Sequence, residues 1–136
     1  YRESRGDGFG MEVRRRINFG NYVLSSGYAD EFYYKAVKVR ELLRHDYVQA
    51  FKDVDAILTP TTPTPAFKIG EKTANPLSMY LEDVFTVPIN LVGVPAISVP
   101  SGKTSDNLPL GVQFTAAHGG EETLFTLARA LEDERV

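Results

Sequence analysis

Two charged positions are the strongest candidates for chemistry in this chain: the run Arg14–Arg16 and the carboxylate of Asp83. Three consecutive residues span most of a helical turn, so the three guanidinium groups cannot share one environment. We therefore expect at least one to face the body of the protein, where it needs an anion, either structural or a ligand. Asp83 is predicted in mid-helix, where Asp is unfavourable. It is either a buried carboxylate that binds a cation or an exposed neighbour of Glu82.

The other reactive side chains favour structural roles. His45 falls on the charged face of a predicted helix and His118 in a glycine-rich turn, so both are interpreted as surface histidines. Ser25 and Ser26 have no neighbouring base pattern and are expected to cap a helix end. The chain has no cysteine, which excludes disulfides, thiolate metal sites and a thiol nucleophile within it. The common hydrolase, metalloprotease and nucleotide-binding motifs do not occur.

Composition sets broad limits on the class of protein. The chain has 136 residues, enough for one domain, and its 43% hydrophobic and 24% charged residues are typical of a soluble globular protein. The net charge of −3 disfavours a nucleic-acid binder. No apolar run reaches the ~18 residues that a membrane-spanning helix needs. Because the chain begins at Tyr1 without a domain start, we interpret it as a fragment.

Helical periodicity predicts the elements that carry these residues. One helix is expected from Phe9 to about Gly27, whose positive φ would end it, and a second from an N-cap at Asp30 to about Phe51. A third is expected over 77–91, interrupted near Thr86 by Pro88. A closing amphipathic helix is expected over 121–132.

Three short apolar runs predict strands, at 56–58, 96–99 and 110–115, and the last two should form a hairpin. Because each run is almost continuously apolar, we expect these strands to be buried on both faces, in the middle of a layered sheet. The class is therefore α/β. A sheet of this kind with only three strands again suggests a missing N-terminal portion.

Several stretches together resemble the C-terminal part of the amidase-signature family, and in particular its branch of glutamyl-tRNA(Gln) amidotransferase A subunits. In chain order they read GFGMEVRRRINFGNYVLSSGYADEFYYKAVKVR, DAILTPTTPTPAFKIGE, NPLSMYLEDVFTVPINLVGVPAISVPSG and PLGVQF. The resemblance covers nearly the whole chain. It implies that residues 1–136 are the C-terminal part of a single domain with an α/β/α layered fold and a mixed sheet, without its catalytic N-terminal portion.

This resemblance implies a glutaminase. Arg16 matches the family arginine that holds the α-carboxylate of glutamine, and Asp83 matches the aspartate that holds its α-ammonium. The family's catalytic triad of two serines and a lysine belongs to a stretch that this chain does not contain. No catalytic residue is therefore expected here, and the isolated fragment is expected to be inactive.

The resemblance also implies partners. Ammonia would pass to the B subunit, which uses ATP and Mg²⁺ to amidate the glutamate on tRNA(Gln), and the C subunit would help to hold the A and B subunits together. This implies a cytoplasmic heterotrimer without a membrane partner, and no cofactor or metal in this chain itself. Three alternatives remain open: another amidase-signature hydrolase, a non-catalytic interaction module, and a helix-turn-helix nucleic-acid binder, which the net charge disfavours.

Overall fold

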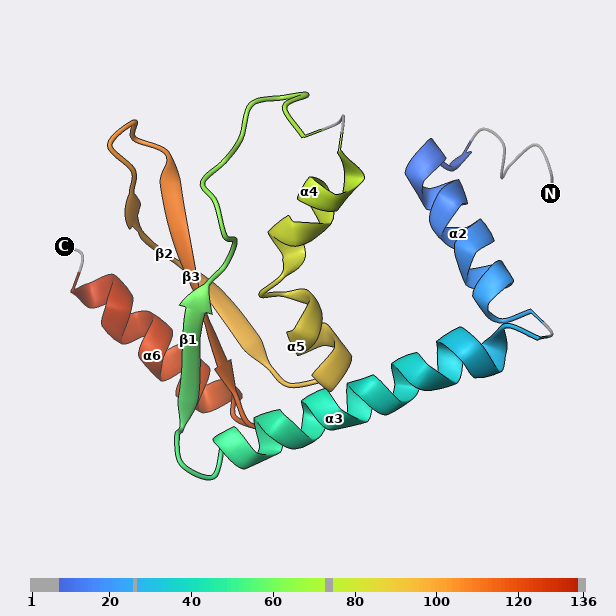
Figure 1. Ribbon diagram of the computed structural model, residues 1–136. Helices are drawn as coiled ribbons and strands as arrows, with labels where there is room; N and C mark the ends of the chain where they lie inside the picture. Colours follow the sequence, from blue (N-terminus) through green and yellow to red (C-terminus); the bar gives the residue numbers. More distant parts are fainter. Residues whose placement is uncertain (1–7, 26, 73–74, 135–136) are drawn as a thin grey trace. The chain divides into compact units, whose positions relative to one another are not determined.

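The computed structural model describes residues 8–25, 27–72 and 75–134 of the chain. They form two compact units, one ending at Glu41 and the other beginning at Leu42 (Figure 1). The first unit is helical, and the second holds the sheet.

The first unit contains helix α2 (Met11–Val23), a π-helical turn (Ala29–Tyr33) and the beginning of helix α3 (Tyr34–Ala50). Gly27 has the predicted positive φ of 90°, but α2 ends four residues before it. The prediction of Asp30 as an N-cap is wrong. The π-helical turn already begins at Ala29, so Asp30 lies inside its first turn, where the free N–H groups of a helix start favour a negative charge.

The second unit is built on a sheet of strands β1 (Ala56–Pro60), β2 (Ala96–Lys103) and β3 (Pro109–Ala116). The order is β1-β3-β2 and both pairings are antiparallel. The predicted hairpin of β2 and β3 is confirmed. Strand β2 does not stop before Pro100 as expected, because a register irregularity between Pro100 and Gly102 lets the pairing continue to Lys103.

The second unit also contains the rest of α3 from Leu42 and, in its described residues, four further helical segments: α4 (Pro76–Tyr80), a 3₁₀ turn (Leu81–Asp83), α5 (Val87–Val92) and α6 (Glu121–Asp133). The predicted interruption before Pro88 is confirmed. Pro88 lies in the first turn of α5, where a missing N–H costs nothing. Gly93 ends α5 in the left-handed region, at φ 80°.

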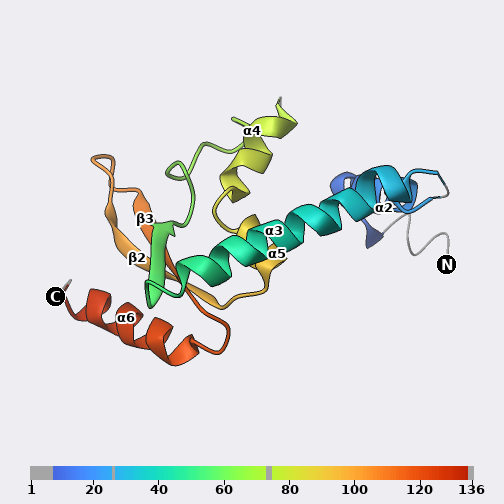
Figure 2. The same ribbon diagram turned by 60° about the horizontal axis from the view of Figure 1, so that its bottom comes forward.

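The two faces of the sheet are covered by different helices. Neighbouring residues of a strand point to opposite faces, and Phe114 lines a cavity with Leu127 of α6 while Gln113 bonds to the Phe85 carbonyl beyond the other face. Both views place α6 on one side of the sheet and α4 with α5 on the other (Figure 1, Figure 2). The layered α/β class is confirmed, although the three strands show no parallel pairing.

The apolar core lies between these layers. Among the described residues its buried apolar members are Ile89, Val92, Val99, Ala116, Leu124 and Ala128. The expectation that every strand is buried on both faces is wrong, because β1 and β2 are edge strands of this sheet. Leu58 on β1 is 58% exposed, while Thr115 on the central strand β3 is fully buried.

Candidate functional site

Arg16 lies on α2 and is exposed, with 66% of its side-chain surface open to solvent. Its Nε donates to Glu12 Oε1 at 3.0 Å, one turn earlier on the same helix. Arg15 reaches the other oxygen of Glu12 at 3.5 Å, and Arg14 donates to the Phe9 carbonyl at 2.8 Å. The expectation that one of the three arginines would be buried is wrong, because local acceptors on the exposed side of the helix serve all three.

Asp83 ends the 3₁₀ turn between α4 and α5 and is exposed as well. Its main-chain carbonyl accepts from the N–H of Thr86 at 3.1 Å, which fixes the backbone at this position. The structure thus matches the second of the two interpretations of this residue, an exposed Asp beside Glu82. Arg16 belongs to the first unit and Asp83 to the second, so their joint action on one ligand stays a prediction.

Glu82, which the sequence analysis does not single out, has a cation partner that is largely removed from solvent. Glu82 and Lys72 form an ion pair and keep only 15% and 17% of their side-chain surfaces exposed. The second carboxylate oxygen of Glu82 accepts from Thr64 Oγ1 at 2.9 Å, and Lys72 Nζ lies 4.4 Å from the centroid of the Phe67 ring. We call these four residues the Lys72–Glu82 cluster.

Electrostatics of the cluster favour the ionised carboxylate. The hydrogen bond from Lys72 is the main reason that the pKa of Glu82 lies below its usual value of 4.5. Partial removal from water acts in the opposite direction, and the hydrogen bond from Thr64 adds to the lowering of the pKa. No helical or strand periodicity links Lys72 to Glu82, because the loop between β1 and α4 brings them together; the sequence carries no signal for this contact.

A buried glutamine also reaches the segment around Asp83. Gln113 on β3 is only 5% exposed, and its Nε2 donates to the Phe85 carbonyl at 3.1 Å. On the same face of the sheet, the hydroxyls of Thr61 and Ser98 lie 2.7 Å apart. The Gln113 hydrogen bond connects the sheet to the backbone two residues beyond Asp83.

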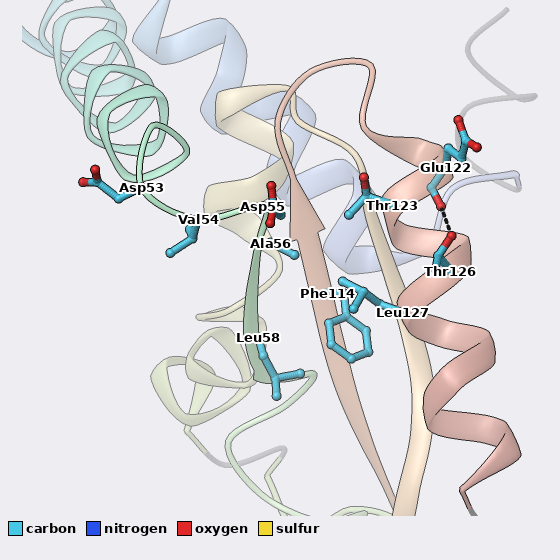
Figure 3. Close-up of a pocket in the computed structure, with 10 residues that line it drawn as sticks. All are labelled: Asp53, Val54, Asp55, Ala56, Leu58, Phe114, Glu122, Thr123, Thr126 and Leu127. Atoms are coloured by element: carbon cyan, nitrogen blue, oxygen red, sulfur yellow. Dashed lines mark hydrogen bonds between the residues drawn. The ribbon is translucent and has the colours of Figure 1, made fainter.

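The sheet and α6 line a cavity of about 750 Å³ that is open to solvent (Figure 3). Leu58, Phe114 and Leu127 supply apolar walls, and the carboxylates of Asp53, Asp55 and Glu122 are at its rim. Its described lining contains no Lys, Arg or His, so it offers no cationic partner for a carboxylate ligand. Its chemistry is that of a packing surface.

The remaining candidates do not form a reactive centre. His45 and His118 are exposed, as predicted. Ser25 Oγ donates to the Tyr22 carbonyl at 2.7 Å at the end of α2, which confirms its capping role, while Ser26 lies outside the described residues. Within 8–25, 27–72 and 75–134, no three His, Asp or Glu side chains are placed to hold a metal ion. No helix in that part of the chain has the length and apolar character needed to cross a membrane.

Known proteins resemble this chain along almost its whole length. The sequence profile of the family described as Amidase matches residues 1–125. The A subunit of glutamyl-tRNA(Gln) amidotransferase from Koribacter versatilis is 58% identical over 132 residues, which cover 97% of this chain and 28% of that protein. The crystal structure of the protein of the same name from Thermotoga maritima matches with a TM-score of 0.73 and 45% identity, covering 96% of this chain and 29% of the other.

A crystal structure described as amidase gives a similar fold match at lower identity. Its TM-score is 0.75 at 27% identity, over 98% of this chain and 30% of that one. The chain thus spans less than a third of the length of these relatives. The resemblance drawn from the sequence motifs is confirmed. With a profile match over most of its residues and these relatives, the chain belongs to the amidase family.

Proposed function

We propose that this chain is the glutamine-binding part of a glutaminase whose ammonia is used to amidate Glu-tRNA(Gln). The observation that supports the proposal most strongly is the 58% identity to an amidotransferase A subunit over 97% of the chain. That identity is well above the 27% shared with the solved structure described as amidase. The function is therefore assigned to the tRNA amidotransferase branch rather than to amidases in general.

In this proposal Arg16 and Asp83 hold the two charged ends of glutamine. A free amino acid is a zwitterion, and one cation with one anion is a direct way to select it. Arg16 already forms an ion pair with Glu12, which the substrate carboxylate would have to displace. Exchange is feasible, because exposed ion pairs contribute only about 0–1 kcal/mol. The exposed Asp83 is likewise accessible to an ammonium group.

The other parts of the reaction are assigned to residues and proteins outside this chain. Two serines and a lysine would attack the glutamine side-chain amide and release ammonia. The B subunit would use ATP and Mg²⁺ to activate the glutamate on the tRNA, and the C subunit would hold the cytoplasmic assembly together. The chain by itself is then expected to release no ammonia from glutamine.

The test uses the complete glutaminase protein with its partners, carrying Arg16→Ala or Asp83→Ala. Each variant should lose roughly 30-fold or more in kcat/KM for glutamine, which corresponds to about 2 kcal/mol for a charged contact. Amidation driven by free ammonia should stay unchanged, because it bypasses glutamine. Arg15→Ala and Asp106→Ala are matched controls that remove the same charges from other exposed positions.

Two results would contradict the assignment. If both variants keep the glutamine reaction, Arg16 and Asp83 do not bind the substrate, although the family membership stands. If both lose the ammonia-driven reaction as well, they serve the structure of the assembly instead.

An amide hydrolase outside the tRNA branch is the second candidate, favoured by the fold match to the solved amidase. Such an enzyme would act on neutral amides, for which a paired cation and anion have no use. Hydrolysis of neutral amides at rates equal to or above those for glutamine, unaffected by Arg16→Ala and Asp83→Ala, would support this alternative.

A further inference from the structure

The backbone that carries Asp83 is attached to the rest of the second unit by side chains on both sides. On the N-terminal side, the carboxylate of Glu82 is held by Lys72 and by Thr64, both from the loop that follows β1. On the C-terminal side, the Phe85 carbonyl accepts from the buried side chain of Gln113 on β3. Asp83 lies between these two attachments.

The geometry of the 3₁₀ turn relates the directions of the Glu82 and Asp83 side chains. A 3₁₀ helix has three residues per turn, so successive side chains point about 120° apart. With the Glu82 side chain directed toward Lys72 and Thr64, the Asp83 side chain must point elsewhere, and it is exposed. Rotation of the turn about its axis would break the contacts of Glu82 and move both carboxylates together.

The Lys72–Glu82 cluster is well suited to resist such rotation. Both carboxylate oxygens of Glu82 accept a hydrogen bond, one from an ammonium and one from a hydroxyl. Lys72 is confined in turn by Thr64 Oγ1, 3.3 Å from its Nζ, and by the ring of Phe67. A charge pair with little exposed surface is screened less by water and salt than a surface pair.

We propose that Lys72 and Glu82 are positioning residues for Asp83, which they hold in the orientation that accepts the ammonium group of the substrate. This inference rests on the proposed function, since it assigns to Asp83 the role of ligand. Glu82 touches no substrate in this arrangement. Its carboxylate is already occupied by Lys72 and Thr64, which leaves the neighbouring Asp83 as the accessible acid.

The experiment measures glutamine kinetics in the complete glutaminase protein with its partners, for Lys72→Met, Glu82→Gln and the double variant. Each single variant should raise KM for glutamine roughly tenfold, with little change in kcat, because substrate binding is weakened and the chemical step is not. The double variant should be no worse than either single one, since the two residues act as a unit. Amidation driven by free ammonia should be unaffected.

Three further variants separate positioning from general stability. Lys72→Arg keeps the cation and should restore KM to near the wild-type value. Lys68→Met makes the same change at an exposed lysine of the same loop and should have no effect. Thr64→Val removes the hydroxyl that bonds to Glu82 and Lys72 but keeps their ion pair, so it should raise KM by a smaller factor. It provides a test if the Lys72 variant folds poorly.

Asp83→Ala, measured in parallel, distinguishes failure of this inference from failure of the proposed function. If Asp83→Ala abolishes the glutamine reaction while Lys72→Met and Glu82→Gln leave KM unchanged, the inference is overturned and the function stands. If Asp83→Ala leaves the glutamine reaction unchanged, Asp83 does not bind the substrate, and the site assigned in the proposed function is wrong. Loss of the ammonia-driven reaction in the Lys72 and Glu82 variants would also overturn the inference, since it would show a general structural role.

Discussion

Two adjacent acids, Glu82 and Asp83, have opposite environments in this structure. Glu82 is largely covered and bonded to Lys72 and Thr64, whereas Asp83 is exposed. The sequence identifies Asp83 as a candidate, because Asp is unfavourable inside a helix and a family motif includes it. It does not identify Glu82, because an acid in a helical pattern is ordinary and its cation lies in an irregular loop.

Titration of Glu82 tests the electrostatics of the cluster. Its pKa should lie below 4.5 in the wild-type chain, mainly because Lys72 bonds to the carboxylate. In Lys72→Met the pKa should rise, since the largest lowering contribution is lost while partial burial still raises it. Carboxyl-detected NMR across the acid range measures both values; a pKa that does not move in the variant would contradict this account.

The same shift makes stability depend on pH. Because the pKa of Glu82 is lower in the folded state than in the unfolded chain, its stabilising contribution is fully present above the usual value of 4.5. It is lost as the pH falls from there through the folded-state pKa. The difference in free energy of unfolding between wild type and Glu82→Gln should therefore be constant near neutral pH and shrink in acid.

Gln113 is a buried polar side chain whose role is structural. Replacing it with Leu removes the donor to the Phe85 carbonyl and should lower the free energy of unfolding by about 1 kcal/mol. Urea denaturation measures the loss. Thr59→Val removes only a 3.4 Å contact to the same amide and should have a smaller effect. Equal losses of unfolding free energy in the two variants would mean that the hydrogen bond to the Phe85 carbonyl is not the main contribution of Gln113 to stability.

Among the secondary-structure elements, the helical segments between Asn75 and Gly93 begin and end where local sequence rules predict. Asn75 Oδ1 accepts from the N–H of Leu77 and caps α4, Pro88 opens α5, and Gly93 closes it with φ 80°. These are local rules, in which one residue type determines one backbone conformation. For that reason the interruption of this segment could be predicted without knowledge of the fold.

Gly93→Ala tests how strongly that helix end depends on glycine. A Cβ at Gly93 would meet no atom within 4 Å, so the cost is conformational and not steric. The left-handed region costs an alanine about 1–2 kcal/mol, which should appear as a lower free energy of unfolding. Gly20→Ala is the matched control, because it lies inside α2 and should be stabilising by about 0.5–1 kcal/mol. Equal changes in the free energy of unfolding at Gly93 and Gly20 would show that the left-handed conformation of Gly93 does not make alanine unfavourable there.

Predictions that depended on long-range packing were less successful. The hairpin and the closing helix were predicted, because periodicity and turn residues specify them locally. The apolar character of 56–58 predicts burial on both faces, yet in this chain β1 is an edge strand with Leu58 exposed. The prediction that one of Arg14–Arg16 is buried is wrong for a similar reason. Glu12 and the Phe9 carbonyl supply acceptors that residue spacing alone does not reveal.

On the scale of the whole molecule, the chain carries many apolar side chains outside its small core. Leu58 on the edge strand β1 and Phe125 on α6 are examples, as is the apolar wall of the cavity between β1 and α6. The chain corresponds to 28% of the length of its Koribacter relative. An edge strand and an adjoining apolar surface together favour association with another protein surface.

We therefore expect the isolated chain to self-associate and to melt early. Light scattering after size exclusion should give a mass above the monomer value of 15.1 kDa that rises with concentration. Leu58→Lys should reduce this association, because a charge on an exposed edge strand opposes pairing with another chain. Ile69→Lys makes the same change at an exposed position in a loop, away from the strand edges, and should leave the mass unchanged. A constant monomer mass with a cooperative melt at high temperature would show that the second unit is self-sufficient, and that its exposed apolar surface does not need a partner.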